Sequence, residues 1–147
     1  MRLIMMLVLF VLPPIFAQVS DDMTPVDTVE KTFKGMAKRD AAMIRSTMLS
    51  NARLYSVRAD GTTAGSALED FIRQIDSSNG DVLERFTSQP NVSIRGRLAQ
   101  VWGEYEFLRD GKFHHCGVDS VSLFRTAEGW KIATIVYTVE MTGCKGQ

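Results

Sequence analysis

The residues of this chain that could carry out acid–base chemistry gather in its last third. His115 and Asp119 stand four residues apart in a segment with the composition of a strand, so both side chains point to one face of a sheet, about 13 Å apart. Along a regular strand they cannot touch, but both can face one bound molecule, with either residue as the base. The alternative roles are ordinary ones, a hydrogen-bonded histidine at a strand end and a salt-bridged acid at a rim.

Aromatic and acidic side chains elsewhere could complete a pocket around these two residues. Aromatic walls with a few convergent polar groups are the usual lining of a small-molecule site. The predicted ligand-binding residues are Tyr55, Trp102, Glu104, His115, Asp119 and Tyr137. Trp102 and Tyr137 are also explained as core residues, and burial decides whether Glu104 has a raised pKa or is an ordinary exposed carboxylate.

Several common kinds of site have no motif in this sequence. His114 and His115 are the only histidines, and adjacent residues of a strand point to opposite faces, so no metal site is predicted. Neither a G-x-S-x-G nucleophile elbow nor a phosphate-binding glycine loop is present, and no cofactor is predicted. The 17 basic and 17 acidic residues give no electrostatic reason to expect nucleic acid as a partner.

Three long strands must position the candidate residues. They are predicted at 98–108, 113–125 and 130–140, joined by a tight turn at Asp110-Gly111 and a three-residue loop that ends at Gly129. With regular pairing, Tyr105 lies opposite Cys116. The same reasoning places Phe124 opposite Ile132.

This register divides the three strands into two apolar faces. One face collects Val101, Tyr105, Val118, Phe124, Trp130, Ile132 and Val136. The other, more pocket-like face collects Trp102, Glu104, His115, Asp119, Val121, Leu123, Ile135 and Tyr137. A one-residue bulge would exchange the memberships beyond it. Because both faces are apolar, we expect helices to cover one and a second copy of the chain to cover the other, giving a homodimer.

The segment before these strands is mostly helical. Thr24 and Pro25 begin a helix that ends near residue 38, Asp40 begins a second, short one, and a capping box of Ser66 and Glu69 begins a third. A strand is predicted at 53–58, a connecting segment at 81–90 and a short strand at 92–94. This order predicts an α+β fold, in which a cone-shaped, curved antiparallel sheet packs against three N-terminal helices.

The chain also carries the signs of export. Residues 1–17, with Arg2, an apolar run and Ala17 at a plausible cleavage point, are predicted to be a signal peptide, with an uncleaved anchor as the alternative. Residues 18–147 then form one domain, periplasmic or secreted, with no membrane attachment after cleavage. Export and an even cysteine count predict a Cys116–Cys144 disulfide, and two free thiols in a reducing compartment are the alternative.

This pattern resembles the nuclear transport factor 2-like superfamily, the cone-shaped fold shared with ketosteroid isomerase and polyketide cyclases. The resemblance covers residues 24–144 and is most similar to exported bacterial members of unassigned function. It is carried by segments 38–42, 64–68, 98–102, 105–107, 115–119, 129–132 and 137–138. Ketosteroid isomerase pairs a carboxylate base with a tyrosine and a protonated acid. Those residue types occur here but do not match position by position, so that activity is not carried over.

Two main classes of function therefore compete. The favoured prediction is an exported module that binds a small, largely apolar molecule in the cone, because the sequence shows no tight acid–base pair. The alternative is an isomerase, cyclase or dehydratase that uses His115 or Asp119 as acid or base, and a third is a subunit-association module. A deep cavity that contains these residues, with a raised carboxyl pKa, would favour the enzyme, whereas a filled cone would favour association.

Overall fold

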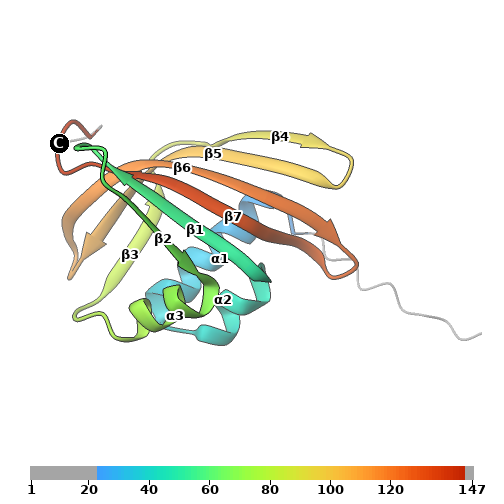
Figure 1. The fold of residues 1–147 in the computed structure, drawn as a ribbon, viewed down its shortest axis with the longest axis horizontal. Helices are drawn as coiled ribbons and strands as arrows, with labels where there is room; N and C mark the ends of the chain where they lie inside the picture. The colour runs from blue at the N-terminus through green and yellow to red at the C-terminus, as the bar shows by residue number, and fades with distance from the viewer. Residues whose placement is uncertain (1–22, 145–147) are drawn as a thin grey trace, which may run out of the picture.

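In the computed structural model, residues 23–144 form one curved sheet with three helices packed against its concave side (Figure 1). The predicted signal peptide, residues 1–17, lies outside these described residues. The helices are α1 (Pro25–Lys38), α2 (Ala41–Thr47) and α3 (Leu68–Asp76). The strands are β1 (Met48–Arg58), β2 (Thr63–Ala67), β3 (Val82–Phe86), β4 (Asn91–Arg95), β5 (Leu98–Arg109), β6 (Lys112–Thr126) and β7 (Gly129–Val139). Within the described part of the chain, no helix is long and apolar enough to cross a membrane.

The sheet contains all seven strands and confirms the predicted α+β fold. Its order is β2-β1-β7-β6-β5-β3, and β4 pairs with the other end of β5. Every pair is antiparallel except β1 and β7, which run parallel, so the sheet is mixed where an antiparallel one was predicted. The parallel pair arises because β7, the last strand of the two long hairpins, lies beside β1, the strand that follows the first two helices.

The first two helices begin as the sequence predicts, and the third does not. At α1, the Thr24 hydroxyl accepts a hydrogen bond from the Asp27 amide (3.2 Å) and the Asp27 carboxylate accepts one from the Thr24 amide (2.8 Å). The predicted capping box at α3 is wrong, since the cap is Ala67 without a side-chain bond. Ser66 belongs to β2, and the Glu69 carboxylate instead pairs with Arg45 at 2.7 Å.

Two short strands lie where the sequence predicted none. The predicted connecting segment 81–90 contains β3, and residues 63–67 form β2 along the edge of β1. Strand β1 also begins at Met48, five residues before its predicted start. The short strand predicted at 92–94 is confirmed as β4. Both missed strands have only five residues, and the partner of β3 lies about 20 residues or more farther along the chain, which a local pattern does not register.

The two long hairpins are present, but their registers differ by one residue from the predicted ones. Asp110 (φ 52°) and Gly111 (φ 70°) make the predicted tight turn. Tyr105 lies opposite Gly117, not Cys116, because His114 is an extra residue in a bulge between the Phe107–His115 and Leu108–Phe113 pairs.

The shorter turn explains the other error in register. Thr126 pairs with Gly129, so Phe124 lies opposite Lys131, not Ile132. Ala133 is an extra residue of β7 farther from the turn, between the pairs of this strand with Leu123 and Ser122. The bulge at His114 and the shorter turn together correct the predicted faces. Trp102 and Glu104 lie on the convex face of the sheet, and the buried concave face instead receives Val101, Tyr105 and Phe107 from β5.

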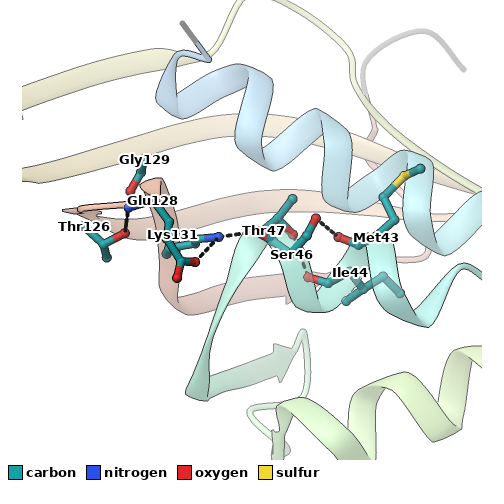
Figure 2. A network of polar contacts seen from close by, with 8 residues as sticks. All are labelled: Met43, Ile44, Ser46, Thr47, Thr126, Glu128, Gly129 and Lys131. Atoms are coloured by element: carbon teal, nitrogen blue, oxygen red, sulfur yellow. Dashed lines mark hydrogen bonds and ion pairs between the residues drawn. The ribbon is translucent and has the colours of Figure 1, made fainter. Parts of the chain in front are cut away.

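The turn between β6 and β7 is fastened to the end of α2 (Figure 2). The Lys131 ammonium donates a hydrogen bond to the Ser46 carbonyl oxygen (2.6 Å) and pairs with the Glu128 carboxylate at 3.3 Å. Within the turn, the Thr126 hydroxyl accepts a hydrogen bond from the Glu128 amide at 3.0 Å. These contacts hold the wide end of the sheet against the helices.

At the opposite end of the sheet, the predicted Cys116–Cys144 disulfide is present, with a Cα–Cα distance of 6.0 Å. The backbone of Cys116 exchanges two hydrogen bonds with that of Glu140, each 2.9 Å long. The neighbouring Gly117 allows the chains to approach, because a Cβ there would lie 2.1 Å from the Thr138 carbonyl oxygen. The bridge therefore fixes the end of the chain beside the start of β6.

Candidate functional site

A cavity of about 230 Å³ lies between the helices and the concave face of the sheet. Its walls are mostly apolar and come from both layers. Helices α1 and α3 and strands β1, β5 and β7 supply Phe33, Met36, Phe71, Ile75, Leu54, Phe107 and Ile135. The cone is thus not filled by its own side chains, and the space suits a small molecule that is largely apolar.

A small group of polar side chains interrupts this apolar lining. Gln74 of α3 and Ser78 after it line the cavity, and four different strands supply Glu84, Arg109, His115, Asp119 and Tyr137. Because strands of a sheet are held by their hydrogen-bond ladders, these side chains sit on a rigid support. An arrangement of this kind, with few polar groups in an apolar cavity, is typical of sites that orient a ligand by one polar end.

The most unusual feature of the cavity is a pair of carboxyl groups. Asp119, in the middle of β6, is only 2% exposed, and Glu84 reaches it from β3 on the other side of β5. The Oδ2 atom of Asp119 accepts no hydrogen bond from a donor among the described residues. Its neighbour is another carboxyl group, which can donate a hydrogen bond only while it holds a proton. The two groups therefore suit a state in which they share one proton.

Burial favours this shared proton. It raises the pKa of Asp119 to about 7, although the hydrogen bond with Glu84 acts in the opposite direction. The pKa of Glu84 is raised well above its usual value, first by burial and then by the charge of Asp119. Near neutral pH the pair thus holds one proton, and it presents a carboxylate and a carboxylic acid side by side.

Two tyrosines border the carboxyl pair. Burial raises the pKa of Tyr105 and of Tyr137, and the charges of Glu84 and Asp119 raise both further. The Tyr105 hydroxyl donates a hydrogen bond to the Thr138 carbonyl oxygen (2.7 Å), so it supports the structure of the sheet. Tyr137 lines the cavity opposite Asp119 in the strand register and can offer a neutral hydroxyl to a ligand.

His115 forms another part of the lining. Its ring stacks on that of Phe107, with centroids 4.7 Å apart, and meets the ring of Tyr105 edge-on. Burial, helped by the nearby positive charges of His114 and Arg109, lowers the pKa of His115 to about 4. His115 is therefore a neutral imidazole at physiological pH, able to donate or to accept one hydrogen bond.

The structure brings together three of the six predicted ligand-binding residues. His115, Asp119 and Tyr137 line the same cavity. Trp102 (45% exposed) and Tyr55 (48% exposed) lie on the convex face, and Glu104 borders a different hollow beside the disulfide. The bulge at His114 moves Trp102 and Glu104 to the convex face, and Tyr55 lies there because its neighbour Leu54 is the buried residue of β1.

Sequence reasoning missed Glu84, which completes the carboxyl pair. Its segment was interpreted as a connection, because the residues 82–86 do not alternate between apolar and polar types, and only the structure shows that Val82, Glu84 and Phe86 point inward. The partner of Glu84 was not predictable either, because Asp119 lies two strands away in the sheet.

No known protein-family model matches this chain, and no curated protein matches it by sequence. Solved structures do match. A nuclear transport factor 2-like protein of unknown function from Shewanella baltica OS155 has 17% identity and a TM-score of 0.61, with 80% of this chain and 91% of that chain covered. A nuclear transport factor 2-like superfamily protein from Salmonella enterica serovar Typhimurium LT2 has 11% identity and a TM-score of 0.63, with 82% and 92% covered.

A third similar structure is a candidate dehydratase of the nuclear transport factor 2-like family from Streptomyces avermitilis. It has 15% identity and a TM-score of 0.61, and the match covers 78% of this chain and 92% of that chain. At these identities the likeness concerns the fold. The chain has the nuclear transport factor 2-like fold, as the order of its elements predicts.

Proposed function

We propose that this protein is an acid–base enzyme that binds a small, largely apolar molecule in the cone and moves a proton on it. The observation that carries the proposal is the Glu84–Asp119 carboxyl pair inside an apolar cavity. A raised carboxyl pKa in a cavity is the feature that separates the enzyme from the binder. Buried carboxyl groups without a cationic partner are costly, and function is the usual reason for keeping them.

The chemistry follows from the shared proton. The carboxylate of the pair can remove a proton from a carbon or a hydroxyl group of the ligand, while the carboxylic acid donates a hydrogen bond to an oxygen of the same ligand. Returning the proton to another carbon gives an isomerisation, and giving it to a departing hydroxyl gives the loss of water. Both reactions need only the two carboxyl groups and a ligand oriented between them.

The cavity also limits the ligand. Its volume of about 230 Å³ and its apolar walls suit a ring or short chain with one or two oxygen atoms. A ligand that carried its own carboxylate would meet the negative charge of the pair. We therefore expect a neutral molecule with a carbonyl or hydroxyl group, which Tyr137 and His115 can also contact.

The test begins with native mass spectrometry of the protein purified from its own host, which identifies a ligand that stays bound. That ligand is then incubated in D₂O with the wild-type protein, with Glu84→Gln and with Asp119→Asn. We expect the wild-type protein to place deuterium on carbon or to convert the ligand, and each variant to do so at least a hundredfold more slowly. Glu30→Gln, which removes an exposed carboxylate of α1, is the matched control and should keep the wild-type rate.

A binding module without catalysis is the second candidate, and the mostly apolar lining of the cavity favours it. In that case the ligand binds but returns from the wild-type protein unchanged and without deuterium. That result would contradict the proposal of an enzyme and support a binding module. Purification of a folded protein that never carries a small molecule would count against both.

Export and self-association complete the proposal. A disulfide is stable in the periplasm or outside the cell, so the Cys116–Cys144 bridge supports export after cleavage near Ala17. Mass spectrometry of host fractions should find the chain without its first residues in the periplasm or the medium, and an intact Met1 would contradict this. The homodimer is proposed to form through the convex face, which exposes Tyr55, Trp102, Phe124 and Val136.

A further inference from the structure

The bulge in β6 brings two histidine rings together. On a regular strand the side chains of His114 and His115 would point to opposite faces, but the extra residue at the bulge changes this. Their Nδ1 atoms lie 2.8 Å apart, and the ring centroids are separated by 5.1 Å. A distance of 2.8 Å between two imidazole nitrogens requires a proton between them, donated by one ring and accepted by the other.

This contact decides what His115 can offer to a ligand. A neutral imidazole carries its proton on one nitrogen and a lone pair on the other. Nδ1 of His115 is occupied by His114, so only Nε2 remains for the cavity that His115 lines. If His115 donates from Nδ1, its Nε2 presents a lone pair to the cavity, and if Nδ1 accepts, Nε2 presents an N–H.

We propose that His114 is a positioning residue that sets whether His115 presents a hydrogen-bond acceptor or a donor to the ligand. Its importance for catalysis rests on the proposed function, whereas the relation between the two rings does not. A protonated His114 has hydrogens on both nitrogens and must donate to His115, which forces the proton of His115 onto Nε2. A neutral His114 can accept, which leaves Nε2 with its lone pair.

The surrounding charges select the state of the neutral pair. Arg109 of β5 lines the same cavity as His115, and Arg58 of β1 is also near enough to act on it electrostatically. Positive charge near the ring stabilises a lone pair on Nε2 relative to an N–H, so a neutral His114 should accept and His115 should present its lone pair.

The other ionisable groups around His115 do not reverse this preference. Tyr105 meets the His115 ring edge-on and keeps its proton, and so does Tyr137 across the cavity. Asp119 lies four residues farther along β6, about 13 Å from the position of His115, and shares its proton with Glu84, which lies on β3 at the level of Phe107. His115 itself stays neutral whichever form His114 takes, because the burial that lowers the pKa of His115 to about 4 disfavours a positive charge on its ring.

The consequence is a site with two ligand preferences. With His114 neutral, His115 accepts a hydrogen bond and favours a ligand hydroxyl at that end of the cavity. With His114 protonated, His115 donates and favours a carbonyl oxygen. A change of pH therefore alters the polarity of one cavity atom without placing a charge in the cavity.

The test is nitrogen NMR of the full chain, without ligand, labelled with ¹⁵N in its histidines. In the wild-type protein, Nε2 of His115 should have the shift of a nitrogen with a lone pair at high pH. It should move to the shift of a protonated nitrogen with an N–H coupling as His114 becomes protonated. His115 should remain neutral throughout, with one protonated ring nitrogen. An Nε2 that already carries its hydrogen at high pH, or a His115 that becomes charged together with His114, would overturn the proposal.

A substitution can distinguish the effect of the His114 nitrogen from the effect of its ring. His114→Phe keeps a ring that can contact Phe107, as His114 does at 6.0 Å, but has no nitrogen. We expect the pH-dependent shift of His115 Nε2 to disappear in this variant, and an unchanged shift would contradict the proposal. Should the variant fail to fold, the titration of the wild-type protein still decides. Because no ligand is present, these results do not depend on whether the protein catalyses a reaction.

Discussion

The two faces of the sheet have similar apolar content and entirely different surroundings. Leu123 and Phe124 are neighbours on β6, yet Leu123 is fully buried against the helices and Phe124 is 47% exposed. The concave face has its apolar residues covered, and it holds the Glu84–Asp119 pair, whose pKa values are raised by burial. The convex face leaves its apolar residues open. Apolar composition alone therefore marks neither face as the site, and the helices that cover one of them make the difference.

Carboxyl groups also have different pKa values on the surface and inside the cone. Carboxylates on the exposed surface, such as Glu69, pair with arginine and have a lowered pKa because the Arg45 guanidinium donates hydrogen bonds to the carboxylate. Inside the cone, the carboxyl groups of Glu84 and Asp119 contact each other instead, and burial raises the pKa of both. The same residue types thus have lowered pKa values on the exposed surface and raised pKa values inside the cone.

The largest effect should come from truncating the two neighbours on β6. Leu123→Ala removes a buried side chain of the core and should lower the free energy of unfolding by about 4 kcal/mol. Phe124→Ala removes a half-exposed ring and should lower it by less than about 1 kcal/mol in the monomer. Urea denaturation at low protein concentration measures both. Equal losses would mean that the faces are not buried as described.

The disulfide joins the end of the chain to the start of β6 beside the narrow end of the cone. Replacing both cysteines, as Cys116→Ser with Cys144→Ser, opens a loop of 28 residues and should cost about 3 kcal/mol of unfolding free energy. Denaturation of this variant should match that of the wild-type protein in a reducing buffer. A wild-type protein that is insensitive to reduction would show that the bridge adds nothing to stability.

The carboxyl pair predicts a dependence of stability on pH. A carboxyl whose pKa is raised by folding stabilises the protein while it is protonated, and this stability is lost as the pH rises from about 4 through about 7. Asp119→Asn removes that loss, so the variant should be more stable than the wild-type protein at pH 8 by roughly 2 kcal/mol and similar to it at pH 5. Glu30→Gln, on the exposed surface, should follow the wild-type curve. A constant difference between Asp119→Asn and the wild-type protein from pH 5 to 8 would argue against a shared proton.

The smallest effect on folding should come from the convex face. Trp102→Glu places a charge among exposed apolar residues and should change the unfolding free energy of the monomer by less than about 0.5 kcal/mol. It should weaken the proposed homodimer at least tenfold, as sedimentation velocity over a range of concentrations would measure. Lys34→Gln, on the exposed side of α1, makes an equal change in charge and should leave the dimer intact. If the wild-type protein remains monomeric at high concentration, the proposed homodimer is wrong.

The sequence by itself determined the class of fold and the position of most elements. The Asp110-Gly111 turn and the apolar runs around it predicted the three long strands, and Thr24 and Asp40 marked the starts of the first two helices. The Cys116–Cys144 bridge followed from two cysteines at one end of the sheet. These features depend on local backbone preferences and on apolar periodicity, which a sequence displays directly. It also named His115 and Asp119, which do line the cavity.

Only the tertiary structure decided which side chains share the cavity. The bulge at His114 shifts the pairing of β5 with β6 by one residue, and such a shift moves every side chain beyond it to the other face, which is why Trp102 and Glu104 lie outside. The bulge at His114 also creates the contact between the two histidines. The pairing of Glu84 with Asp119 was hidden as well, because it joins strands that are distant in sequence. Its chemistry arises from burial, a property of the packed cone that no short stretch of residues encodes.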